Sequence, residues 1–401
     1  METKRGVNRR DFLWTIGSLS SMALLGGGTA FALNSQLTQP ARNARLSAAW
    51  MPKGDTSYTL FKRAIEGATD FSWLNKGDRV LVKLALNSGN PYPATSDPWA
   101  LDCLLRVLKE HGATKVYVGD QSGVRNVYWT PMGQVRGTSR AFAVSSGLMP
   151  VIERNGATAV FFEERGYPAY FEGVPAGEHH WKQPMQITSL VKEVDHIIYL
   201  PRVSSHGLAD ISSGMKIGVG FLREDSRKLF HQGGENFYAM YSEISEVPEI
   251  KSRLRLTVSS GRSVMTLIGP DAGHIVEPES APIFASESLL ANELFAYAFL
   301  QFTRETMTPK DVSDPALGGN LWDVQKNRTV RNRNFMKLVW NLPESEMPEL
   351  PVFQAGDIYR HPAILNYIRL NRHQDVRFSV LELNENSDAK ARLYMQGQLK
   401  V

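Results

Sequence analysis

Two apolar runs of strand length enclose a helical segment near the start of the chain, and this order restricts the fold more than any other feature of the sequence. The runs are RVLVKLAL and KVYVGD, which lie on either side of DPWALDCLLRVLKEHG. The middle segment has leucines at helical spacing, with Asp97 and Pro98 as start signals and Gly112 as a stop signal. A strand, a helix and a strand in this order predict a right-handed crossover between parallel strands, and therefore an α/β sheet.

Further strand-like and helix-like segments continue this alternation. The runs ATAVFFEE and VDHIIYL are typical of buried strands. The segments AFAVSSGLMPVIERNG and PIFASESLLANELFAYAFLQF contain helices by their spacing. Together they favour an α/β fold in which a mostly parallel sheet has helices on both faces.

Shifts in composition suggest the domain boundaries. Residues 33–57 are polar and interrupted by proline, which is typical of a linker. We expect an α/β core domain at residues 58–304. Residues 305–401 have weaker periodicity, so we expect a smaller C-terminal extension that packs on the core.

The first 32 residues have the pattern of an export signal. Arg9 and Arg10 precede a moderately apolar segment diluted by glycine and serine, and a small-residue cleavage pattern ends at Ala32. This resembles a twin-arginine signal peptide, which implies the twin-arginine export machinery as a partner and the periplasm as the location. The apolar part is shorter than the roughly 20 residues of a membrane span, so we expect no stable span after signal removal; an uncleaved anchor is the alternative.

Charge argues against a nucleic-acid partner. The formal net charge is +4, and it falls to +2 without the first 32 residues. The remaining chain has no dense Lys/Arg stripe interleaved with aromatic residues. The basic segment RNRNFMK, residues 331–337, is expected to be the solvated face of a helix.

Cysteine content restricts the cofactors. Cys103 is the single cysteine and lies among helix-spaced leucines, so we expect it to pack as a small apolar residue. An iron–sulfur cluster held by this chain is not expected, because such clusters normally need about four thiolates.

Polar loops follow four of the expected strands, and ligands of open α/β sheets bind beyond the carboxyl ends of the strands. The loops are rich in Gly, Ser, Asp or His, which suggests that they share one crevice. They are residues 86–98, 119–126, 201–216 and 269–280.

Sequence blocks between residues 78 and 300 resemble the domain of unknown function 362 family, and the block from His206 to Gly220 is the most specific. The matching positions are Lys83, Gly119, Asp120, Ser122, Gly123, Pro201, His206, Lys216, Gly220, Gly269 and Pro270. The chain departs from the family at Arg202, where lysine is common, and at Ile217, where asparagine is common. Glu287 and Asn292 replace an aspartate pair, and a cysteine-rich ferredoxin-like segment of many members is absent.

His206, Lys216 and His231 follow one another at a spacing similar to that in the nickel-dependent lactate racemase family. This resemblance implies a pyridinium-derived nickel-pincer cofactor, with Lys216 as its anchor, His231 as the metal ligand and His206 as the general base. The chemistry is coherent, because imidazole exchanges protons near neutrality and a desolvated lysine becomes nucleophilic. Simple structural roles for the three side chains are the alternative.

We therefore expect an exported protein that binds a small anionic substrate or cofactor in the shared crevice. The residues expected to bind the anion are Lys83, Asp120, Ser122, Gly123 and Arg202. His206 and Lys216 are the expected catalytic residues of a proton transfer like that of a racemase or epimerase. The alternative is a non-catalytic periplasmic binding or accessory protein for a redox or metal-assembly system, so the sequence leaves open whether the protein is an enzyme.

Overall fold

The computed structural model describes residues 13–15, 44–350, 356–371, 378–384 and 388–399. Apart from residues 13–15, the expected signal peptide lies outside the described residues, and it stays a prediction. No helix in the described ranges combines the length and the apolar character needed to cross a membrane.

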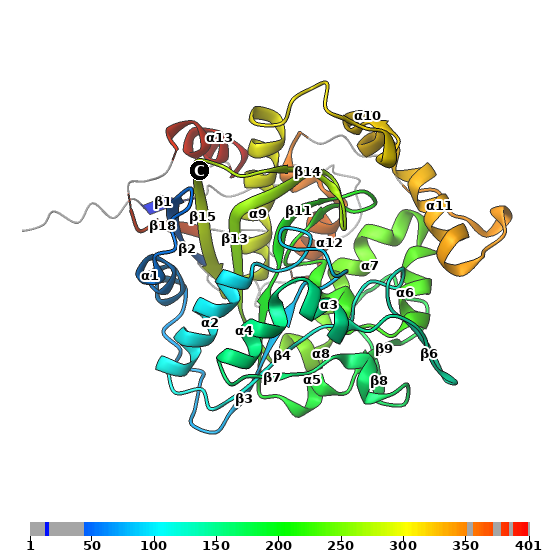
Figure 1. Ribbon diagram of the computed structural model, residues 1–401, viewed down its shortest axis with the longest axis horizontal. Helices are drawn as coiled ribbons and strands as arrows, with labels where there is room; N and C mark the ends of the chain where they lie inside the picture. Colours follow the sequence, from blue (N-terminus) through cyan, green and yellow to red (C-terminus); the bar gives the residue numbers. More distant parts are fainter. Residues whose placement is uncertain (1–12, 16–43, 351–355, 372–377, 385–387, 400–401) are drawn as a thin grey trace, which may run out of the picture.

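One large sheet forms the centre of the molecule (Figure 1). Its parallel half consists of β13 (Leu254–Ile268), β10 (His196–Leu200), β3 (Arg79–Leu84), β4 (Lys115–Gly119) and β7 (Thr158–Ala159), in this spatial order. On the other side of β13, β15 (Ser280–Ser286) and β2 (Ala44–Pro52) are antiparallel, and β18 (Phe378–Glu382) is parallel to β2. At the edge, β1 (Leu13–Thr15) is antiparallel to β18. The predicted α/β class is confirmed.

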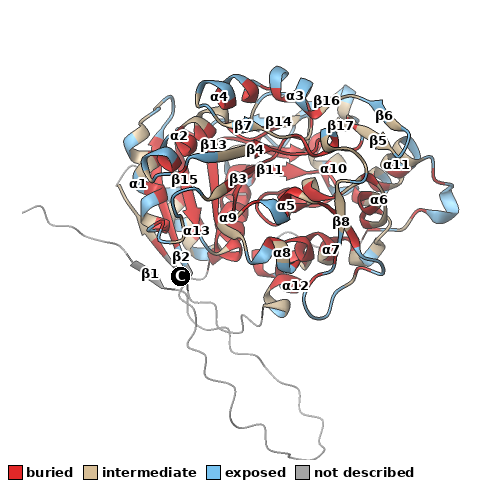
Figure 2. Ribbon diagram, turned by 90° about the horizontal axis from the view of Figure 1, so that it is seen from below, coloured by how far each residue is buried: buried red, intermediate tan, exposed pale blue. Residues whose placement is uncertain are grey.

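Helices cover both faces of the sheet because alternate strand residues point to opposite sides. Val80 and Val82 pack in one apolar core with α1 (Tyr58–Ala68), α2 (Pro98–Glu110) and α4 (Leu148–Arg154). Leu81 belongs to a second core with α7 (Phe237–Glu243), α9 (Leu289–Thr306) and α12 (Pro362–Leu370). Figure 2 shows the buried strands between these two sets of helices. By the same alternation, Lys83 lies on the side of the second core.

The crossover β3–α2–β4 forms as the sequence predicts. The Asp97 carboxylate accepts the backbone N–H of Trp99 at 2.9 Å and caps α2, and Pro98 is its first residue. Strands β3 and β4 are adjacent and parallel. Local capping signals therefore located this unit correctly.

Two expectations about individual segments were wrong. Residues 44–52 of the expected linker form β2, which lies inside the sheet between β15 and β18. The single helix expected at 141–156 is two helices, α3 (Ser139–Ser145) and α4, because Gly147 between them has a φ of 79°. A left-handed residue cannot continue an α-helix, and glycine adopts this conformation at little cost.

The C-terminal residues contribute to the sheet as well as to its surface. Strand β18 joins β2, while α12 packs against α7 and α13 (Ala389–Leu399) packs against α9. The expected domain boundary near residue 305 stays a prediction. The remaining helices are α5 (Leu190–Glu193), α6 (Glu224–His231), α8 (Pro248–Lys251), α10 (Leu321–Lys326) and α11 (Arg328–Trp340). The remaining strands are β5 (Tyr128–Thr130), β6 (Gly133–Arg136), β8 (Tyr170–Gly173), β9 (Met185–Thr188), β11 (Arg202–His206), β12 (Asp210–Ser212), β14 (Gly273–Val276), β16 (Ser313–Asp314) and β17 (Gly319–Asn320).

Candidate functional site

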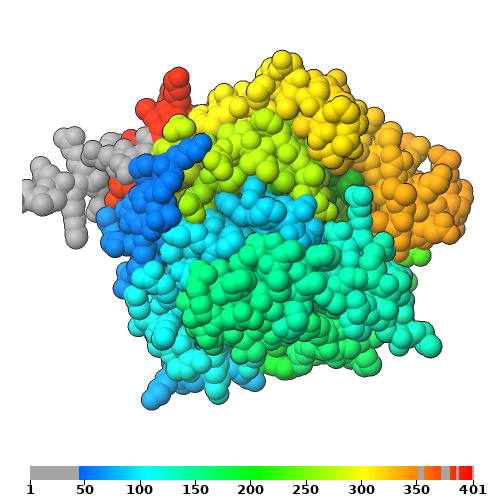
Figure 3. Space-filling view, viewed as in Figure 1, coloured from blue at the N-terminus to red at the C-terminus, as the bar shows by residue number. Residues whose placement is uncertain are grey.

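A cavity of about 380 Å³ lies at the carboxyl ends of β3, β4 and β10. Residues from all four predicted loops line it, for example Asn87, Gly123, Pro201 and Asp271. Most of the rest of the wall comes from residues 217–220, from α6 and from the segment from Leu317 to Val339. Figure 3 shows the recess between this yellow-to-orange segment and the blue-green part of the surface. The shared crevice expected from the loops is therefore present in the structure.

The segment that carries His206 and Lys216 contains two strands where we expected a loop, and Lys216 itself lies in the turn after the second strand. Strand β11 pairs with β12 in an antiparallel arrangement and with β13 in a parallel one. The turn between β11 and β12 is fixed by Asp210, whose buried carboxylate binds Arg304, Arg328 and the hydroxyl of Tyr297. This anchoring brings α9 and α11 onto the hairpin.

Arg202, Lys216 and Arg331 line the cavity and have unpaired donors, and none of the three is an exposed residue. Arg202 is 1% exposed and uses its terminal nitrogens on the Ala94 carbonyl and the Ser212 hydroxyl, but its buried Nε has no partner. The buried Nε of Arg331 also has no partner. Among the residues that the structure describes, none forms a hydrogen bond or ion pair with the Lys216 amine or the Arg331 guanidinium. These donors are available to a ligand.

Arg227 of α6 adds charge to the cavity, and most of its donors bind backbone carbonyls. Its guanidinium donates to the carbonyl oxygens of Leu222, Gln121, Ser122 and Gly220. It therefore holds the turn after β4 next to the start of α6. Burial lowers the pKa of Lys216 to about 7, and the charges of Arg202 and Arg227 add to this effect.

Lys83, which we expected to bind the anion, does not line the cavity. Its fully buried ammonium lies 2.6 Å from Asp120 and donates to the carbonyls of Leu84 and Ile217 at 2.8 and 3.1 Å. Three donors are thus matched by three acceptors. Gly220 permits this pair, since a Cβ there would lie 2.0 Å from the Asp120 carboxylate. Lys83 therefore does not contact the interior of the cavity; it holds in place Asp120 and Ile217, which line it.

Only some residues of the turn after β4 line the cavity, and the others stabilise the turn. Asp120 and Gly123 line the cavity, whereas Ser122 does not and is fully buried. The Ser122 amide donates to the Ser139 hydroxyl at 2.9 Å, and its carbonyl accepts from Arg227. The expected contact of Ser122 with an anion is therefore not supported by its position.

His206 lines the cavity as a neutral hydrogen-bond donor. Its Nδ1 accepts the backbone N–H groups of Leu208 and Ala209 at 3.1 and 3.2 Å, so the proton of the neutral ring resides on Nε2. Burial lowers the pKa of His206 well below 6.5, and Lys216 and Arg202 lower it further. With Nδ1 occupied and Nε2 protonated, the ring has no free lone pair, which disagrees with the general-base role that the resemblance implied.

His231, at the end of α6, has the opposite tautomer. Its Nδ1 donates to the Arg227 carbonyl at 2.7 Å, so Nε2 of the neutral ring is unprotonated. Burial lowers the pKa of His231 to about 3. Phe335 and Trp340 of α11 pack against the ring, with centroids 4.7 and 5.0 Å away. His231 therefore offers one lone pair, as a metal ligand or a proton acceptor needs.

The two tautomers lead to a spectroscopic prediction. Nitrogen-15 NMR of the imidazole rings should show His206 protonated at Nε2 and His231 protonated at Nδ1. The His231 pattern should persist from pH 8 to pH 5.5, because burial lowers the pKa of His231 to about 3. The His206 ring should stay neutral at pH 6.5, because its pKa is lowered well below that value. A second proton on His206 at pH 6 would contradict the assignment.

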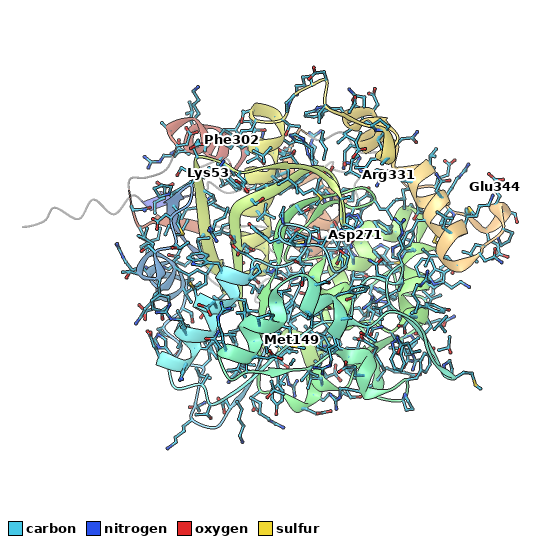
Figure 4. All side chains as sticks on the ribbon, viewed as in Figure 1. Lys53, Met149, Asp271, Phe302, Arg331 and Glu344 are labelled. Carbon is cyan, nitrogen blue, oxygen red and sulfur yellow. The ribbon has the colours of Figure 1, made fainter. Side chains whose placement is uncertain are left out.

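Several lining residues were missed in the sequence, and two of them, Asp271 and Arg331, are labelled in Figure 4. Asp271 follows β13 and has a buried Oδ1 without a partner; it belongs to a predicted loop, but no motif singled it out. Arg331 comes from the basic segment expected to be a solvated face. That expectation was wrong for Arg331 and Phe335, because α11 directs them toward the cavity.

Protein side chains alone do not form a metal site in this region. Across the described ranges, no three His, Cys, Asp or Glu side chains are grouped so that they could hold an ion. A metal at His231 would therefore need most of its ligands from another molecule.

Comparisons with known proteins agree with the family resemblance. A family model for a domain of unknown function (DUF362) matches residues 80–298. No curated protein matches the chain. Among solved structures, the chain is similar to the lactate racemase apoprotein from Thermoanaerobacterium thermosaccharolyticum, with 16% sequence identity, a TM-score of 0.39, and coverage of 61% of this chain and 53% of that chain.

A protein from Thermotoga maritima is also similar, with 18% identity, a TM-score of 0.35, and coverage of 53% of this chain and 52% of that chain. The matches thus span about half the length of each of these structures. The family model, in contrast, covers more than half of the 401 residues. The chain therefore belongs to the family of the domain of unknown function DUF362.

Proposed function

We propose that the cavity binds a small organic anion through Arg202, Lys216 and Arg331. The observation that carries this proposal is the set of unpaired cationic donors in one cavity. Burying the Nε donors of Arg202 and Arg331 without acceptors costs free energy, and an anion that accepts their hydrogen bonds recovers it. Asp120 adds little opposing charge, because it is already paired with Lys83. Asp271 also lines the cavity and offsets part of the positive charge, but the three cations outnumber it.

One side chain of this cavity suits proton transfer on the bound anion. Lys216 has a pKa of about 7, so its amine can accept or donate a proton near neutrality. His231 has an unprotonated Nε2. We therefore assign the acid–base role to Lys216, the acceptance of a hydrogen bond or of a metal to Nε2 of His231, and to His206 the donation of a hydrogen bond from Nε2 to the ligand.

The nickel-pincer group implied by the resemblance is compatible with these residues. The unpaired amine of Lys216 could anchor it, and Nε2 of His231 could supply one metal ligand. Such a group would supply an electron acceptor when bound. The cationic lining would bind its anionic substituents, and the Phe335 ring beside His231 would shield that side from water.

A binding or accessory protein without turnover is the second candidate. It is favoured by the tautomer of His206, which leaves the cavity with more hydrogen-bond donors than proton acceptors. In this case too, we propose export to the periplasm by the twin-arginine machinery. Incorporation of deuterium from D₂O into a panel of carboxylic acids separates the two candidates: exchange that is lost in Lys216→Gln supports an enzyme, and its absence at saturating acid supports binding alone.

Anion binding can be tested with two arginines of the same helix. We expect Arg331→Met to weaken sulfate binding at constant ionic strength about tenfold or more, because a hydrogen bond to a charged group contributes about 1.5–3 kcal/mol. Arg333→Met is the matched control, since Arg333 pairs with Glu349 and does not line the cavity. Isothermal titration calorimetry measures both. Equal affinities of the two variants would contradict the assignment.

A further inference from the structure

A buried carboxylate lies beneath the segment that carries Lys216. Glu293, near the start of α9, is 1% exposed, and its Oε2 accepts the backbone N–H of Met215 at 2.9 Å. Gly214 allows the segment to lie this close to the helix, because a Cβ there would be 2.9 Å from Leu289 and 3.4 Å from Glu293. The residue next to Met215 is Lys216, so Glu293 fixes the backbone directly before the amine-bearing side chain.

No cation compensates this carboxylate. Within the described part of the chain, no ion pair involves Glu293, and burial raises its pKa to about 7 even though backbone hydrogen bonds oppose the shift. A buried carboxyl group without a cationic partner costs stability, and an apolar residue would fill the same space at less cost. A role of Glu293 beyond packing would explain why the protein retains a buried carboxyl group that lowers its stability.

The helix around Glu293 is itself held in place. The neighbouring Asn292 accepts the hydroxyl of Ser259 at 2.8 Å and donates to the carbonyl of Thr257 at 3.1 Å, both on β13. These bonds fix the start of α9 to the central sheet. Glu293 therefore links residues 213–216 to a helix that is fixed to the central sheet.

We infer that Glu293 is a positioning residue that holds the Lys216 amine in the anion-binding cavity. Glu293 does not line that cavity, so it acts through the backbone of Met215. The inference rests on the proposed anion-binding function, because Lys216 is the group that Glu293 positions.

The test compares substitutions that keep or remove the acceptor for Met215. Glu293→Leu should weaken sulfate binding about tenfold. It should also shift the pH midpoint at which Lys216 titrates, which is measured by reductive methylation and mass spectrometry. Glu293→Gln keeps an acceptor at the same reach and should stay within about threefold of the wild-type affinity. Gln301→Leu is the control, because Gln301 is a buried polar residue of α9 away from the cavity.

The outcomes separate this inference from the function on which it rests. Wild-type affinity and an unchanged Lys216 midpoint in a folded Glu293→Leu variant would overturn the inference alone. Unchanged sulfate affinity in Lys216→Ala would overturn the proposed function instead. If Glu293→Leu does not fold, Glu293→Asp decides: its shorter side chain withdraws from Met215, so it should bind sulfate more weakly than Glu293→Gln, and equal binding would overturn the inference.

Discussion

Reductive methylation with formaldehyde at pH 7 is expected to modify Lys216 well before the exposed lysines. Burial, assisted by Arg202 and Arg227, lowers the pKa of Lys216 to about 7, so about half of its amine is neutral at this pH. An ordinary lysine, with a pKa of about 10.4, has about one neutral amine in 2,500. Mass spectrometry of the peptide that contains Lys216 measures the rate from pH 5 to pH 9, with Lys53 as the exposed reference.

The same experiment reports on the ligand. Sulfate stabilises the protonated amine, so it should raise the pKa of Lys216 and slow methylation at pH 7. For the same reason, sulfate affinity should fall as the pH rises from 6 to 8, since Lys216 loses its charge in this range. Replacing Arg202 with methionine should raise the midpoint, because one of the repelling charges is removed. A midpoint near 10 in the wild-type protein would show that the amine is not desolvated.

The largest effect on stability is expected from Lys83→Met. The substitution leaves the Asp120 carboxylate buried without its cation, and breaking a buried ion pair in this way costs about 3–5 kcal/mol. Urea denaturation followed by circular dichroism should show this loss in the free energy of unfolding. Conformation at the cavity should change as well, since Asp120 accepts the backbone N–H of Leu86 and of Gln121.

Lys62→Met is the matched control for this experiment. Lys62 also pairs with a carboxylate, Glu110, at 2.7 Å, but on the surface, where such pairs contribute little. Its free energy of unfolding should therefore differ little from that of the wild type. A similar small change in Lys83→Met would mean that Lys83 is not the required partner of Asp120.

Much of the parallel half of the sheet could be predicted because its signals are local. The cap at Asp97, the helical spacing of the leucines and the apolar strands on either side lie within about 40 consecutive residues. Strand β2 could not be predicted in this way. Its residues mix polar and apolar side chains, and its partners β15 and β18 come from far along the chain.

The sequence predicted the location of the candidate site, at the loops after the strands, and the residues of the family block from His206 to Gly220. His206, Lys216, Arg202 and His231 do meet in one cavity. The tautomers of the two histidines depend on backbone groups that the sequence does not reveal. They leave His206, the expected base, without a free lone pair, and they give one to His231.

Arg331 shows why other site residues were missed. It reaches the cavity because Asp210, more than a hundred positions earlier, binds Arg328 at the start of α11. Lys83 is the opposite case. A lysine in an apolar strand suggested a functional role, but its ammonium group is fully paired with Asp120 and two backbone carbonyls. Both outcomes depend on contacts between distant segments.

The most direct test of anion binding at this cavity is anomalous diffraction from crystals of the full chain grown with selenate, which has the shape and charge of sulfate. We predict an anomalous peak with selenate oxygens at hydrogen-bond distance, about 2.7–3.2 Å, from Arg202, Lys216 and Arg331. A cavity without selenate, at a concentration that saturates binding in solution, would contradict the account.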